Sequence, residues 1–207
     1  MKLDFPPGDF AGHIFDCDGT VVDSMPLHFH AWIAALEAHD APFEFTEQYF
    51  YAAAGLAEAD VTRRLNAEHG ANLDPEGIVK SKNEWLVAHI PEMKSVPAVE
   101  AIVRKLAAEG VPIAVASGSK LRIVEPELEV VGLRDLFEII ITPEFVERGK
   151  PFPDMFLLAA EKMGVAPEKC LVYEDGQSGI DAATAAGMAH VYVPTGDARL
   201  AELAKLG

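Results

Sequence analysis

The alternation of short apolar runs with helical patterns is the feature that most restricts the fold of this chain. The runs are rich in β-branched and aromatic residues, as strands buried on both faces are. They cover residues 12–15, 111–116, 137–142, 170–173 and 190–193. Between them, the spacing predicts helices at 97–109, 121–131, 153–163 and 178–186, each followed by a glycine where a left-handed C-terminal cap belongs. Strands that alternate with helices predict a parallel sheet with right-handed crossovers, a doubly wound α/β fold.

One segment interrupts this alternation. From about residue 26 to residue 91 there is no convincing strand pattern, and helical patterns cover 27–39, 58–68 and 76–88. We therefore expect a Rossmann-like α/β core at residues 1–26 and 92–207, with an inserted α-helical cap at 27–91. An insertion directly after the first strand would lie over the carboxyl end of that strand, where open α/β sheets bind their ligands.

The charge balance restricts what the chain can bind. Its 207 residues include 33 acidic and 17 basic side chains, a formal net charge of −16. Such a chain repels nucleic-acid backbones and anionic membrane surfaces, so we expect neither as a partner. No apolar run approaches the ~18 residues that span a bilayer, no secretory signal is evident, and two cysteines cannot form a disulfide framework. We therefore expect a cytoplasmic protein, in which any phosphate site needs a metal ion and specific lysines.

Two acidic residues follow the first predicted strand, in the segment Asp16-Cys17-Asp18-Gly19-Thr20. In an extended segment, residues i and i+2 point the same way, so both carboxylates can face a ligand at the end of the strand. One could attack phosphorus or hold a metal ion, while the other moves a proton to the leaving oxygen. Taken alone, the segment would be better explained as a turn held by side-chain hydrogen bonds.

Polar residues also follow the next two predicted core strands. Ser117 and Gly118 come after the second strand, where a hydroxyl and backbone N–H groups can hold phosphate oxygens. The alternative there is a helix N-cap at Ser119. Lys150 comes after the third strand and is kept out of helical geometry by Pro151. The alternative for this lysine is an ordinary solvated side chain.

A second pair of acids, Glu174 and Asp175, follows the fourth predicted strand. Because the carboxyl ends of parallel strands meet at one edge of a sheet, this pair would approach Asp16 and Asp18. Carboxylates gathered in this way repel one another, and a divalent cation relieves the repulsion. Ligands that are all oxygen favour magnesium over zinc.

Together the four segments resemble the motifs of the haloacid dehalogenase superfamily. The matching residues are Asp16 with Asp18, Ser117, Lys150, and Glu174 with Asp175. The resemblance covers nearly the whole chain, including the helical insertion. From Asp16 through His28 the chain is most similar to the β-phosphoglucomutase group, which includes small bacterial sugar phosphatases.

This resemblance implies a phosphoryl-transfer enzyme that acts on a small phosphorylated metabolite. Asp16 would attack the phosphoryl group to form an aspartyl-phosphate. Asp18 would give a proton to the leaving oxygen and then help to activate the acceptor, while its main-chain carbonyl binds Mg²⁺. The implied metal-binding residues are Asp16, Asp18, Glu174 and Asp175, and the implied phosphate-binding residues are Ser117, Gly118 and Lys150.

The predicted cap contributes three further candidates. His28 and Lys82 match positions of the β-phosphoglucomutase pattern; each could serve the substrate or be structural, Lys82 as part of a solvated helix face. Alignment of the group's cap glycine with Gly55 places Glu58 where the mutase has a phosphate-binding arginine. A carboxylate there would repel a second phosphate. We therefore expect hydrolysis of a small sugar or polyol monophosphate, with a phosphosugar mutase and a catalytically silent binding protein as alternatives.

Overall fold

The computed structural model describes all residues of the chain except 54–55, 197–199 and 202–207. The chain divides into two compact units, which we call the α/β unit (Met1–Asp23 with Met93–Gly207) and the helical unit (Ser24–Glu92). No described helix is long and apolar enough to cross a membrane.

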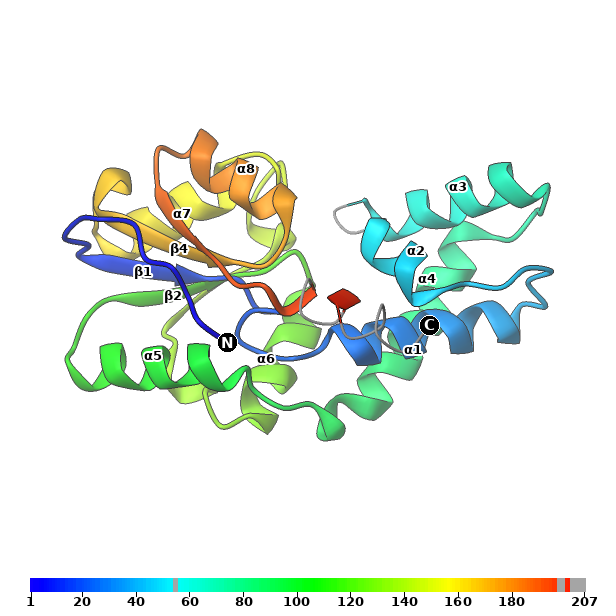
Figure 1. Ribbon diagram of the computed structural model, residues 1–207, viewed down its shortest axis with the longest axis horizontal. Coiled ribbons are helices and arrows are strands. Elements are labelled where there is room, and N and C mark those ends of the chain that lie inside the picture. The colour runs from blue at the N-terminus through cyan, green and yellow to red at the C-terminus, as the bar shows by residue number, and fades with distance from the viewer. Residues whose placement is uncertain (54–55, 197–199, 202–207) are drawn as a thin grey trace. The chain divides into compact units, whose positions relative to one another are not determined.

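The α/β unit is built on a five-stranded parallel sheet in the order β3-β2-β1-β4-β5 (Figure 1). The strands are β1 (Gly12–Phe15), β2 (Ile113–Ala116), β3 (Ile139–Ile141), β4 (Cys170–Glu174) and β5 (Ala189–Tyr192). The helices are α5 (Pro97–Ala108), α6 (Leu121–Val130), α7 (Asp154–Met163) and α8 (Gln177–Ala185), with short 3₁₀ segments η2 (Arg134–Leu136), η3 (Pro143–Phe145) and η4 (Pro167–Lys169). The predicted doubly wound α/β fold is confirmed. Gly110, Gly132, Gly164 and Gly187 all have the positive φ expected beyond a helix end.

The prediction that every strand is buried on both faces is wrong for the two edge strands. Ile139 and Ile140 of β3 are only half-buried, and Tyr192 of β5 is exposed. In contrast, every residue of β2 and β4 is buried. The difference follows from position, because a strand at the margin of a sheet has a neighbour on one side only and less helical cover.

Along each strand the side chains alternate between the two faces of the sheet, and this alternation anchors the residues that follow at its carboxyl edge. Ile14 and Val172 join one apolar cluster with Met155 of α7. Phe15 points to the other face, where its ring stacks on Tyr173 with centroids 4.3 Å apart. Both strands are thus anchored on both faces up to their last residues, so that the side chains that follow are held in fixed positions.

The segments that precede and follow the helical unit are tied to each other within the α/β unit. Val22 and Ser95 form an antiparallel bridge, and the Asp23 N–H donates to the Lys94 carbonyl at 2.8 Å. The chain therefore leaves the α/β unit and re-enters it at neighbouring points.

The helical unit contains α1 (Met25–Ala38), α2 (Glu47–Ala52), α3 (Glu58–His69), α4 (Pro75–His89) and the 3₁₀ segment η1 (Ile90–Glu92). Helix α4 packs against both α1 and α3. The apolar core of this unit includes Trp32, Leu36, Phe45, Phe50, Leu65 and Ile78. Helix α2 was not predicted, because six residues are too few to show a helical period. Its one sequence signal is Thr46, whose side chain accepts a hydrogen bond from the Tyr49 N–H at 3.2 Å.

Candidate active site

The segments singled out in the sequence lie at the carboxyl edge of the sheet. Asp16 directly follows β1, Ser117 directly follows β2, and Glu174 is the last residue of β4. These three strands are neighbours and run parallel, so their carboxyl ends meet at one edge. Lys150 is carried by the longer connection between β3 and α7.

The β1 segment is fixed by its backbone. The Asp16 N–H donates to the Tyr173 carbonyl at 2.9 Å and so continues the β1–β4 ladder. Beyond Asp18 the chain turns at Gly19, whose φ of 76° is in the left-handed region that glycine adopts without strain. The Gly19 N–H then donates to the Val22 carbonyl at 2.8 Å and closes the turn. Asp16 is nearly fully buried, whereas Asp18 is half-buried.

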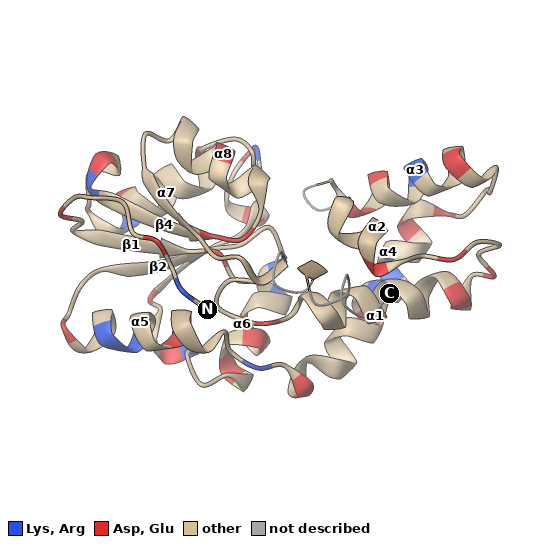
Figure 2. Cartoon of the chain, viewed as in Figure 1, with Lys and Arg blue, Asp and Glu red and all other residues tan. Residues whose placement is uncertain are grey.

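Lys150 supplies the local positive charge that an acidic chain needs for phosphate chemistry. Figure 2 shows the positions of Asp and Glu residues, in red, on elements of both units. The Lys150 Nζ donates to Asp16 Oδ1 at 2.6 Å and to Glu174 Oε2 at 2.7 Å. Burial alone would lower the pKa of this lysine, but the charges of Asp16 and Glu174 outweigh it and raise the pKa above its ordinary value. The alternative of a solvated lysine is therefore wrong, since only 9% of the side chain is exposed.

Asp16, Glu174 and Asp175 form the acidic cluster, in which one carboxylate oxygen from each residue lies within 4.8 Å of the others. Burial, followed by the charge of Glu174, raises the pKa of Asp16 to about 8, although Lys150 opposes the shift. Burial and then the charge of Asp16 also raise the pKa of Asp175 well above its usual range. Buried carboxylates that repel one another at this spacing fit a divalent cation with oxygen ligands.

Glu174 is held at both of its carboxylate oxygens. Oε1 accepts a hydrogen bond from the Gly176 N–H at 3.1 Å, and Oε2 accepts one from Lys150. Its carboxylate lies against Gly179 on α8, so closely that a Cβ at that position would be 2.0 Å from Glu174 Cδ. Sequence reasoning missed Gly179. The signal was present, because a glycine within the predicted helix 178–186 is unfavourable by about 1 kcal/mol relative to alanine and needs a packing reason.

The loop after β2 is organised around Ser117, which is fully buried. Its N–H donates to the Ile141 carbonyl at 3.0 Å, and its Oγ accepts a hydrogen bond from the Ser119 N–H at 3.0 Å. The alternative of a helix N-cap at Ser119 is wrong, because α6 begins at Leu121 with Lys120 as its N-cap residue. The Ser119 hydroxyl donates instead to Asp18 Oδ2 at 2.7 Å.

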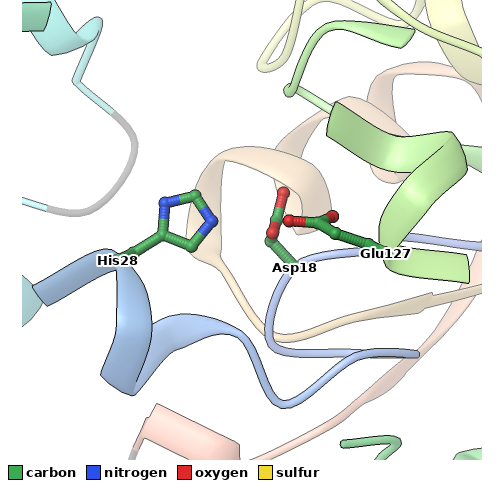
Figure 3. Close-up of side chains that lie close together, drawn as sticks. All are labelled: Asp18, His28 and Glu127. Carbon is green, nitrogen blue, oxygen red and sulfur yellow. The ribbon is translucent and has the colours of Figure 1, made fainter. Parts of the chain in front are cut away.

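A further acid that the sequence reasoning missed, Glu127 of α6, lies beside Asp18. It is fully buried, and a carboxylate oxygen of each residue lies within 4.8 Å of the other (Figure 3). The Cys17 thiol donates to Glu127 Oε2 at 3.6 Å. Burial, followed by the charge of Glu127, raises the pKa of Cys17, so this thiol is neutral at neutral pH. Its spacing indicated a buried position, because Glu127 lies four residues after Ile123 and three after Val124, on the apolar face of the helix.

The three candidates from the predicted cap form one polar cluster inside the helical unit. The Lys82 Nζ on α4 donates to Nδ1 of His28 on α1 at 2.9 Å and forms an ion pair with Glu58 at the start of α3. Asn83 Nδ2 donates to Glu58 Oε2 at 3.4 Å. The alternative of a solvated helix face is wrong for Lys82, whose side chain is 1% exposed. Lys82 compensates the charge of Glu58. The comparison with the mutase arginine depends on Gly55, which lies outside the described residues.

Comparison with known proteins identifies the family. The haloacid dehalogenase-like hydrolases match residues 12–187. The chain is 35% identical over 180 residues to fructose-1-phosphate phosphatase YqaB of Escherichia coli (strain K12), covering 86% of this chain and 94% of that protein. It is 30% identical over 197 residues to β-phosphoglucomutase of Bacillus subtilis (strain 168), covering 90% and 84%. The structure of CbbY from Rhodobacter sphaeroides in complex with phosphate matches with a TM-score of 0.77 at 25% identity, covering 87% of this chain and 84% of that chain. The family match, these relatives and the parallel sheet agree: the chain belongs to the haloacid dehalogenase-like hydrolases.

Proposed function

We propose that this chain is a Mg²⁺-dependent phosphatase that hydrolyses a small sugar or polyol monophosphate through an aspartyl-phosphate on Asp16. The contact that carries the proposal is the bridge from the Lys150 Nζ to Asp16 and Glu174, at 2.6 and 2.7 Å. It combines a nucleophilic carboxylate with a fixed cation at the edge where α/β sheets bind ligands. The similarity to a fructose-1-phosphate phosphatase and, at 30% identity over 187 residues, to hexitol phosphatase A of Escherichia coli supports the substrate class.

The reaction would proceed in two steps on this chain's own side chains. In the first, an Asp16 oxygen forms a bond to phosphorus while the bond from phosphorus to the sugar oxygen breaks, and Asp18 gives its proton to that oxygen. In the second, a water oxygen bonds to phosphorus while the bond from phosphorus to the Asp16 oxygen breaks, a proton of the water passes to Asp18, and phosphate leaves. Ser117, Lys150 and the backbone N–H of Gly118 would hold the phosphoryl oxygens throughout. Such positioning supplies most of the catalysis in phosphoryl transfer.

The acidic cluster is the site proposed for Mg²⁺. Asp16, Glu174 and Asp175 would hold the ion together with the main-chain carbonyl of Asp18. The three residues of the cluster each offer a carboxylate oxygen, and these oxygens lie within 4.8 Å of one another. A ligand set made only of oxygen suits this hard cation. Bound there, the ion would neutralise charge on the phosphoryl oxygens.

The proposal includes a cytoplasmic location and a small phosphorylated metabolite as the partner. A net charge of −16 disfavours nucleic acid and anionic membranes as partners. Lys150 supplies positive charge for phosphate at the proposed site.

A phosphosugar mutase is the second candidate, favoured by the similarity to β-phosphoglucomutase. A mutase must hold a second phosphate while its intermediate turns over. If the group's cap glycine aligns with Gly55, Glu58 takes the position of the arginine that binds this phosphate. The nearby Lys82 is already paired with Glu58. Hydrolysis is therefore the preferred activity. A catalytically silent binding protein is disfavoured because Asp16, Asp18 and Lys150 are all present.

The test is a phosphate-release screen over sugar and polyol monophosphates, run with Mg²⁺ and with EDTA. We expect release with Mg²⁺ only. The matched control is Asp16→Asn, which keeps the shape of the side chain but cannot form the covalent intermediate, and it should lose several powers of ten in turnover. Substantial activity in a well-folded Asp16→Asn protein would refute the mechanism. NMR of glucose phosphates in the same samples separates the candidates, since interconversion of the 1- and 6-phosphates without phosphate release would identify a mutase.

A further inference from the structure

The hydroxyl of Ser119 joins two parts of the candidate active site. Its Oγ donates to Asp18 Oδ2 at 2.7 Å, while its backbone N–H donates to the Oγ of Ser117 at 3.0 Å. Ser119 and Asp18 are 101 positions apart in the chain. The fold therefore creates this contact, by bringing the loop after β2 against the loop after β1.

The local structure leaves the Ser119 hydroxyl available for this contact. A serine directly before a helix commonly caps it, with the side-chain oxygen accepting a hydrogen bond from a first-turn N–H. Here the N-cap residue is Lys120, which makes no side-chain cap. The N–H of Leu121, the first residue of α6, donates instead to Oε2 of Glu144 at 2.9 Å. Glu144 thus accepts the hydrogen bond from the first turn of α6, and the Ser119 hydroxyl donates to Asp18 instead.

Asp18 needs such a contact because its surroundings contain another acid. The carboxyl of Glu127 lies within 4.8 Å of that of Asp18 (Figure 3). An ionised carboxylate only accepts hydrogen bonds, so Glu127 in that form cannot orient an ionised Asp18. A hydroxyl can donate to Asp18 in its ionised form and can still contact it after protonation. Ser119 is therefore suited to hold Asp18 through both steps of a reaction in which the proton leaves and returns.

We propose that Ser119 is a positioning residue for the acid–base function of Asp18, an inference that rests on the proposed phosphatase function. The contact at Oδ2 restrains the carboxyl of Asp18 and leaves Oδ1 as the oxygen that gives the proton. As an Asp16 oxygen bonds to phosphorus and the bond from phosphorus to the sugar oxygen breaks, the Oδ1–H bond breaks and its proton passes to the sugar oxygen. Through its backbone, the same residue holds the Ser117 hydroxyl, so the proton donor and a phosphate-holding group are placed together.

The test compares Ser119→Ala with Ser119→Thr, which keeps the hydroxyl, on two kinds of phosphate ester. A sugar oxygen is a poor leaving group and needs the proton, whereas p-nitrophenolate leaves without one. We expect Ser119→Ala to lower the ratio of kcat/KM for the sugar phosphate to kcat/KM for p-nitrophenyl phosphate by about tenfold, as a partial loss of general acid catalysis. Ser119→Thr should restore most of the ratio. In an Asp18→Ala background, the same serine change should leave the ratio unaltered.

The outcomes separate this inference from the proposed function. An unchanged ratio in Ser119→Ala, with or without a fall in both rates, would overturn the positioning role, because a structural or phosphate-binding role affects both esters alike. A fall of equal size in the Asp18→Ala background would overturn it as well, and this comparison remains decisive if Ser119→Ala folds poorly. If the parent protein hydrolysed neither ester with Mg²⁺, the proposed function itself would fail, and this inference with it.

Discussion

One added methyl group, in Gly179→Ala, tests how the acidic cluster is held. The new Cβ would lie 2.0 Å from Cδ and Oε2 of Glu174 and 2.5 Å from its Cγ. These distances are far below van der Waals contact, so Glu174 must move. It has little room to do so, because it is 3% exposed and is hydrogen-bonded to both Lys150 and Gly176.

Two opposing effects decide the sign of the change. Alanine in place of glycine within a helix usually stabilises by about 0.5–1 kcal/mol. Displacing Glu174 breaks its hydrogen bond from the Lys150 ammonium, which contributes about 1.5–3 kcal/mol, and its bond from the Gly176 N–H, which contributes about 1 kcal/mol. The losses are larger, so we expect Gly179→Ala to lower the free energy of unfolding of the α/β unit by about 2 kcal/mol, within the range for overpacked sites.

The assay can follow the α/β unit alone. Cys17 and Cys170 are both buried in it, so reactivity of the thiols in urea reports its unfolding. Both tryptophans, Trp32 and Trp85, belong to the helical unit, and their fluorescence serves as an internal control that should not change.

A double-mutant cycle identifies the cause of the loss. In a Glu174→Ala background the obstructing carboxylate is absent, so adding the methyl at Gly179 should be neutral or stabilising. An equal loss of stability in both backgrounds would refute the clash with Glu174. A more stable Gly179→Ala protein would show that Glu174 is not held as described.

Three further results are expected. Asp18→Ala should slow turnover by about 10²–10⁴-fold while inorganic phosphate still binds in the presence of Mg²⁺, as measured by calorimetry; parent-like turnover would exclude Asp18 from proton transfer. In EDTA, burial and then the charge of Glu174 raise the pKa of Asp16 in the folded protein from 3.8 to about 8, so that Asp16 holds a proton between these values. The free energy of unfolding should therefore fall as the pH rises from 3.8 to about 8. The melting temperature should depend less on pH in Asp16→Asn and in the parent protein after addition of Mg²⁺. Glu58→Gln removes the anionic partner of the buried Lys82. Because Glu58 is partly exposed, we expect the helical unit to lose only about 1–2 kcal/mol of stability. An unchanged urea midpoint, measured by tryptophan fluorescence, would show that the ion pair contributes nothing.

The fold was predictable from the sequence because its signals are local and repeated. Each strand is a short apolar run, and each glycine beyond a helix marks where that helix ends. The parallel order of the strands was enough to anticipate that Glu174 and Asp175 come close to Asp16. Predicting that these acids lie together required only the order of the strands in the sheet, without knowledge of side-chain packing. The carboxylate of Asp18 was expected in the same group, but the structure places it beside Glu127.

What the sequence could not show depends on contacts between distant segments. The spacing of Ser119 suggested a helix cap, and only the tertiary structure shows its hydroxyl on Asp18. The sequence places Glu127 on the apolar face of its helix, but its position beside Asp18 depends on how that helix packs against the sheet. The place of Lys82 among His28 and Glu58 likewise depends on how three helices pack.

The bridge between Val22 and Ser95 has a consequence for how proteins of this family can diverge. With both crossing points tied together, residues 24–92 are, for the sheet, one closed loop. Even for a flexible loop, the entropic cost of closure grows only with the logarithm of the loop length, so that each doubling costs about 0.6 kcal/mol. An insertion at this point can therefore lengthen, shorten or be exchanged as a module at little thermodynamic cost to the sheet. Such an exchange requires no change in the four segments at the carboxyl edge of the sheet.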